Sequence, residues 1–175
     1  MNLVTALAIS IGALSVLLTW LFTGPVLGGL GLSLWAAFIA WGSFFHCGGG
    51  EAGVQKSLLG ALWGAVCATI ALALANSGAL AGLGGLALPV IVGATVALMV
   101  LGAHMPQLST IPAAVYGYAA TVAFALMGNH VADAMSMNLG SMPFMNVMIS
   151  MAIGAAFGYV SEKIAGSLAS SKAAA

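Results

Sequence analysis

Two histidines, each followed closely by an acidic residue, are the groups in this sequence most able to handle protons or polar solutes. His46 precedes Glu51, and His130 precedes Asp133. An imidazole titrates near neutral pH, and ionisable groups at membrane depth are costly and often functional. We interpret the two pairs as polar gates at the mouths of a pore, with pH-sensitive gating as a consequence. Both pairs are also expected at helix ends. Charged residues in solvated loops at the membrane interface cost little energy, so the pairs need no function to explain them.

A run of three glycines, Gly48, Gly49 and Gly50, follows the first histidine. Glycine lets a backbone turn sharply, and amide groups ahead of a helix N-terminus can face a polar solute. The run is therefore assigned to the same predicted gate. A flexible loop explains it equally well.

Four aromatic residues occupy matching places in the two halves of the chain: Trp41 with Phe124, and Trp63 with Phe157. Aromatic rings that line a pore restrict its bore and exclude hydrated ions, so we predict that these four contribute to a pore wall. Packing against a neighbouring helix, or an aromatic belt at the membrane interface, is the alternative for each of them.

Seven of the ten methionines lie between residues 127 and 151, around His130. Thioethers select Cu(I), and imidazole suits copper or nickel, so a soft-metal site is a second hypothesis. Its candidate ligands are Met135, Met137, Met142 and His130. Methionine is also an adaptable apolar filler, which explains the cluster without a metal.

The composition excludes a free-standing soluble domain. Of the 175 residues, 62% are hydrophobic and 3% are charged, whereas soluble domains carry about 25% charged residues. With no net charge and no arginine, the chain has no basic surface for nucleic acid. The sequence contains no HExxH, GxSxG or P-loop motif, so we expect neither an enzyme nor a cofactor.

Six apolar segments are each about the 20 residues that a membrane-spanning helix needs. Continuous rather than alternating apolar residues favour helices over a β-barrel. The sequence therefore predicts an all-α integral membrane protein embedded in the lipid bilayer. The expected spans are 3–22, 26–45, 55–75, 86–104, 111–128 and 143–165.

The lysines predict the orientation. With six spans, Lys56, Lys163 and Lys172 all fall on the side that also holds both termini. By the positive-inside rule this side is cytoplasmic.

The two halves of the chain resemble each other. Similar stretches recur in order, at offsets of 81, 83, 84 and 94 residues. Because each half has three spans, an odd number, the second half must be inverted relative to the first, as in many transporters. The predicted boundaries are 1–78 for the first repeat, 79–168 for the second and 169–175 for a frayed tail.

Two small-residue motifs, Gly60-x-x-x-Gly64 and Gly154-x-x-x-Gly158, predict close helix packing. They are expected to join the two halves or to join subunits. A homo-oligomer is expected, with closed cyclic symmetry.

The segment from Phe44 to Gly50, together with the Gly/Ala-rich helix after it, resembles a bacterial inner-membrane family, the YcdZ-like proteins of unknown function. This resemblance implies an inner-membrane location and supplies no catalytic residue. In size and number of spans the chain is also similar to the small six-helix channels for urea, amides or acetate, although it lacks an Asn-Pro-Ala-type motif.

These observations favour a channel or facilitator for a small uncharged polar solute, such as urea, an amide or a protonated short acid. A permanently charged substrate would need a countercharge in mid-membrane, and the sequence offers none there. The alternatives are a soft-metal transporter or sensor, and a membrane accessory protein that transports nothing.

Overall fold

The computed structural model describes residues 1–170, and this part of the chain is mainly helical, with no β-strand. The predicted all-helical class is confirmed. Residues 171–175 of the predicted tail lie outside the described part, while residues 169 and 170 still belong to the last helix. The six α-helices are α1 (Leu3–Thr23), α2 (Leu34–His46), α3 (Gly50–Ser77), α4 (Ala87–Leu101), α5 (Ile111–Met127) and α6 (Pro143–Ser170).

Four helices are long and apolar enough to cross a membrane, by length and composition. They are α1, α3, α6 and the segment Ala81–His104, which joins α4 to the 3-10 turns on either side of it. Helices α2 and α5 are shorter, with 13 and 17 residues.

The expectation of a 20-residue helix over 26–45 is therefore wrong. This stretch is apolar, but it is rich in glycine, and Gly31 adopts a left-handed conformation with a φ of 65° that interrupts the chain. The helix starts only after Ser33. At about 1.5 Å per residue, α2 is about 20 Å long, against about 30 Å for the hydrocarbon core of a bilayer.

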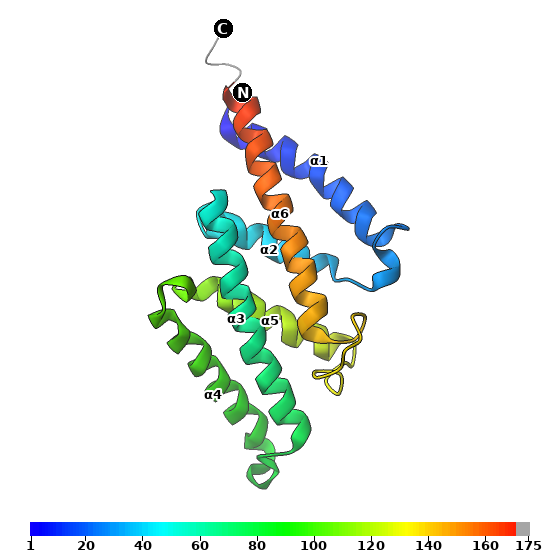
Figure 1. Ribbon diagram of the computed structural model, residues 1–175, viewed down its shortest axis with the longest axis vertical. Helices are drawn as coiled ribbons and strands as arrows, with labels where there is room; N and C mark the ends of the chain where they lie inside the picture. Colours follow the sequence, from blue (N-terminus) through cyan, green and yellow to red (C-terminus); the bar gives the residue numbers. More distant parts are fainter. Residues whose placement is uncertain (171–175) are drawn as a thin grey trace.

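The first two helices of each predicted half pack on the third helix of the other half (Figure 1). Helices α1 and α2 pack on α6, while α4 and α5 pack on α3. The packing units are therefore α1–α2–α6 and α3–α4–α5, joined where α3 contacts α6. Residues 1–78 and 79–168 do not pack as two separate bodies. Figure 1 shows α1 and α4 at opposite ends of the molecule, with α2 and α5 crossing its middle in opposite directions.

The buried positions of α2 recur in α5 at a constant spacing of 77 residues. The same holds for α3 and α6 at a spacing of 90 residues. In α2 the buried residues are 36, 37, 40, 41, 43 and 44, and in α5 they include 113, 114, 117, 118, 120 and 121. In α3 they include 53, 57, 60, 61, 64, 65, 68 and 71, matched in α6 by 143, 147, 150, 151, 154, 155, 158 and 161.

This register differs from the one inferred from sequence similarity. Trp41 matches Tyr118 rather than Phe124, and Gly64 matches Gly154 rather than Gly158. Stretches rich in Ala and Gly can be aligned with one another at several shifts. Sequence similarity alone therefore does not identify the shift at which the buried positions coincide.

Glycines allow the helices to touch backbone to backbone. A Cβ atom added at Gly64 would overlap the carbonyl oxygen of Ala114 in α5, and one added at Gly154 would overlap the carbonyl oxygen of Ala37 in α2. The other two glycines of the predicted motifs lie at the same crossings. Gly60 faces the Ala113 methyl group, and Gly158 faces the Phe44 ring.

Replacing Gly64 or Gly154 by Ala should destabilise the protein, because the new methyl group must push two helices apart. The expected loss is about 1–3 kcal/mol in the free energy of unfolding. It can be measured by denaturant titration in detergent. Gly12→Ala and Gly93→Ala are matched controls, since a Cβ atom meets nothing within 4 Å at either site. Equal stability of all four variants would contradict the backbone contacts.

Candidate functional site

A groove of about 450 Å³ lies between the two short helices α2 and α5. Two pairs of its lining residues are matched positions in the 77-residue register: Ile39 with Tyr116, and Gly42 with Ala119. The groove therefore lies where equivalent faces of α2 and α5 meet. Its remaining lining residues are Phe38 and Ser43.

Three polar side chains stand in or beside this mainly apolar groove. The Tyr116 hydroxyl is hydrogen-bonded to His46 Nδ1 at 2.9 Å. The buried Ser43 hydroxyl accepts a hydrogen bond from Ser57 at 2.7 Å. The groove thus offers a few polar atoms in an apolar wall, an arrangement typical of sites for small, uncharged, partly polar molecules.

Only one of the two predicted histidine–acid pairs forms. His130 Nδ1 lies within hydrogen-bond distance of Asp133 Oδ2, at 3.1 Å, and Phe124 stacks on the same imidazole with ring centroids 5.2 Å apart. His46 pairs with Tyr116 instead of Glu51, because it ends α2 facing α5 while Glu51 begins α3. Glu51 lines a separate hollow with Val54, Gln55 and Tyr159.

The three glycines form the tight turn into α3. All three have positive φ values, 95°, 70° and 62° for Gly48, Gly49 and Gly50. The Gly50 amide donates a hydrogen bond of 2.8 Å to Glu162 Oε2, and Gly49 lies against the same carboxylate. The amide that we expected to face a solute is therefore occupied by Glu162. A carboxylate at the N-terminus of a helix also stabilises the helix dipole.

The predicted aromatic constriction is not assembled within one chain. Trp63 packs between α3 and α4, where its indole donates a hydrogen bond to the Met99 carbonyl oxygen at 2.9 Å. Phe157 packs between α6 and α1, against Trp41 at a centroid distance of 5.8 Å. The two rings therefore lie in different packing units.

Trp41 is buried, and its indole donates a hydrogen bond to Ser161 Oγ at 3.0 Å. This bond ties α2 to α6. The side chain therefore holds α2 in place beside the groove rather than lining it.

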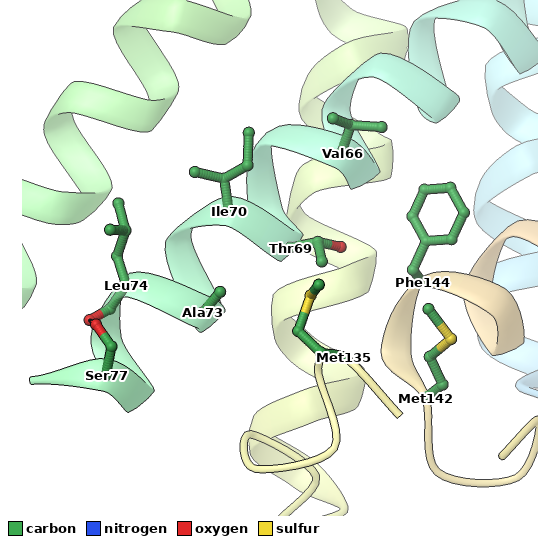
Figure 2. Close-up of a pocket in the computed structure, with 9 residues that line it drawn as sticks. All are labelled: Val66, Thr69, Ile70, Ala73, Leu74, Ser77, Met135, Met142 and Phe144. Carbon is green, nitrogen blue, oxygen red and sulfur yellow. Dashed lines mark hydrogen bonds between the residues drawn. The ribbon is translucent and has the colours of Figure 1, made fainter. Parts of the chain in front are cut away.

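The methionine candidates are divided between two surroundings. Met135 and Met142 line an apolar groove of about 620 Å³ between α3 and the start of α6, as Figure 2 shows. Met137 is 97% exposed and is not among the residues that line this groove. His130 is engaged with Asp133. The four proposed ligands are therefore not gathered around one point, and residues 1–170 contain no group of three or more His, Cys, Asp or Glu side chains that could hold a metal.

A buried polar network, absent from our sequence expectations, fixes the start of α2. Asn146 Nδ2 donates to the carbonyl oxygens of Gly31 and Leu139 at 2.8 and 3.3 Å. Its Oδ1 accepts from the Ser33 hydroxyl at 2.9 Å, and the Ser33 amide donates to Ser150. A lone Asn in an apolar segment is the sequence signal that could have indicated such a network. Two of its partners, Gly31 and Ser33, lie more than 100 residues away in the chain and could not be named from it.

Cys47 adjoins the groove in the turn after His46. Burial raises the pKa of its thiol, and a hydrogen bond with Ser43 and the positive charge of Lys56 oppose this rise. Cys47 and Cys67 are both free thiols.

The chain belongs to the family described as "Protein of unknown function (DUF1097)", which it matches over residues 8–166. The name YcdZ-like rests on the sequence resemblance alone. No curated protein and no solved structure matches the chain.

Replacing Asn146 by Leu should loosen the segments before α2 and before α6, because the buried Ser33 hydroxyl loses its acceptor and the Gly31 and Leu139 carbonyl oxygens lose their donor. Each unsatisfied buried group costs about 1–3 kcal/mol. Hydrogen exchange should accelerate in residues 26–33 and 128–142. The control is Asn138→Ala, which removes only a local turn bond at the surface. Equal exchange rates in both variants would refute the role of the network.

Proposed function

We propose that this protein is a multi-spanning membrane channel or facilitator for a small uncharged polar solute, with the groove between α2 and α5 as part of the path. The observation that carries the proposal is the lining of the groove by matched positions of the two short helices. Such a site takes lining residues from both halves of the chain.

An inverted repeat explains why the groove lies there. Each half contributes three helices, and the buried residues of the second and third helices recur at constant spacings. Helices α1 and α4 run in opposite directions at opposite ends of the molecule. In transporters built from inverted repeats, the solute site lies at the repeat interface near the middle of the membrane. The groove between α2 and α5 corresponds to this place.

The chemistry of the groove favours an uncharged solute. Its lining residues include no Asp, Glu, Lys or Arg, so a permanent charge would lack a partner there. The Tyr116 hydroxyl and the neighbouring imidazole of His46 can exchange hydrogen bonds with an amide, with urea or with a protonated short acid. The apolar wall suits the remainder of such a molecule.

We place the protein in the bacterial inner membrane with both termini in the cytoplasm. The hydrogen bond between Gly50 and Glu162 brings the turn before α3 beside the last turns of α6. Lys56 and Lys163 therefore lie at the same end of the molecule, which supports the positive-inside argument.

The two alternatives, a soft-metal transporter or sensor and an accessory protein that transports nothing, stay predictions. The separation of Met137 from Met135 and Met142 gives the first no geometric support.

Stopped-flow light scattering of proteoliposomes tests the proposal with urea, acetamide, glycerol and acetate at two pH values. We expect one solute to enter faster than into empty liposomes. In Gly42→Leu, the new side chain projects into the groove without a clash, since a Cβ atom there meets nothing within 4 Å. This variant should be about tenfold slower, which corresponds to about 1.4 kcal/mol of added barrier.

Gly93→Leu is the matched control, because it adds the same side chain to an exposed, open position on α4. It should keep the rate of the unmodified protein. Rates no faster than those of empty liposomes for every solute would refute a facilitator for this class. Equal slowing in both leucine variants would remove the groove from the path.

A further inference from the structure

We infer that a second copy of this chain covers the outward face of α2 and α5, so that two facing grooves close into one path between the copies. This outward face consists of Phe38, Gly42, Val115 and Ala119, and we call it the α2–α5 face. The inference rests on the proposed membrane location and goes beyond the proposed function by naming the surface and the number of copies.

The lengths of the helices indicate that lipid is a poor cover for this face. Helices α2 and α5, with 13 and 17 residues, are about 20 and 26 Å long, whereas the hydrocarbon core is about 30 Å thick. The bilayer beside this face would have to become thinner, or its acyl chains would contact the non-helical backbone at the start of α2. By contrast, α1 has 21 residues and the segment containing α4 has 24, which suit contact with lipid.

The side chains of the α2–α5 face favour another helix as its cover. Small residues at the centre of a membrane helix face let a second backbone approach closely, and Gly42 and Ala119 are both exposed. They are flanked by Phe38 and Val115, which are 39% and 42% exposed. The outward side of α4 is mixed, since it presents bulky side chains such as Leu98 and Leu101 beside the small Gly93. None of the five charged residues within 1–170 lies on the α2–α5 face, so a second copy would bury none of them there.

The matched register makes the face complementary to itself. Phe38 and Gly42 in α2 correspond to Val115 and Ala119 in α5, 77 residues later, and the two helices run in opposite directions. A two-fold axis along the membrane normal therefore brings α2 of each copy onto α5 of the other. Gly42 then contacts Ala119 of the partner subunit, and the same contact repeats by symmetry. Two identical contacts close the assembly at two copies.

A second copy would close the open outward side of the groove. In one chain it is bounded by α2 and α5 and is open on the outward side, where Gly42 and Ala119 are exposed. A solute path needs a wall on every side, and in the dimer α2 and α5 of the second copy supply the missing one.

Disulfide cross-linking between two differently tagged copies tests this interface in native membranes. The background replaces Cys47 by Ser and Cys67 by Ala. One copy carries Gly42→Cys and the other Ala119→Cys, and copper–phenanthroline with oxygen is the oxidant. Because a disulfide requires Cβ atoms about 4 Å apart, we expect a dimer that contains both tags to form efficiently.

Gly12→Cys in one copy and Gly93→Cys in the other form the matched control pair, since both are exposed, open positions on α1 and α4. This pair should remain monomeric on a denaturing gel. Absence of the mixed dimer, when a small maleimide still labels both cysteines, would overturn the inference. Equal cross-linking of the control pair would do the same.

Transport measured on the unmodified protein, which keeps Gly42 and Ala119, separates the two proposals. Cross-linking at positions 42 and 119 without transport of any solute would support the interface and refute the proposed function. Transport without this cross-link would refute the interface and leave the function standing.

Discussion

The contact of helix backbones at two glycine crossings is the constraint on which the rest of the structure depends. At Gly64 and Gly154 the space for a Cβ atom is already filled by a carbonyl oxygen of the crossing helix. These crossings hold α5 on α3 and α2 on α6, and they set the positions of the two short helices. The groove, the bond between His46 and Tyr116, and the outward face of α2 and α5 all follow from this arrangement.

Composition was sufficient to predict the helical class. A chain with 3% charged residues and long apolar segments has few other ways to form the hydrogen bonds of its backbone. The length of α2 was not predictable from hydropathy. Hydropathy treats every glycine alike, but Gly31 has a left-handed backbone that ends regular structure before α2, whereas Gly64 and Gly154 lie inside regular helices. The bounds of the other five expected spans lie within a few residues of the bounds of the observed helices.

The candidate site was predicted less well, because its contacts join residues that are distant in the chain. The partner of His46 is Tyr116, 70 residues away, and the partner of the Gly50 amide is Glu162, 112 residues away. By contrast, His130 and Asp133 are three residues apart and pair as their spacing suggested. The predicted register of the repeat differs from the register of the buried positions. Helices rich in Ala and Gly have few distinctive side chains, so their sequences can be aligned at several shifts. The burial pattern, which depends on which helix lies opposite, resolves it.

The exchange of third helices between the two halves has a consequence for the order of assembly. Helices α3, α4 and α5 are continuous in the chain and pack on one another, so this unit can form as soon as residue 127 has been synthesised. Helices α1 and α2 are made first but pack on α6, which is made last. Their packing is completed only after α6 has been made. The oldest segment of the nascent protein is therefore the last to complete its packing, and truncation before α6 removes the helix that it packs on most extensively.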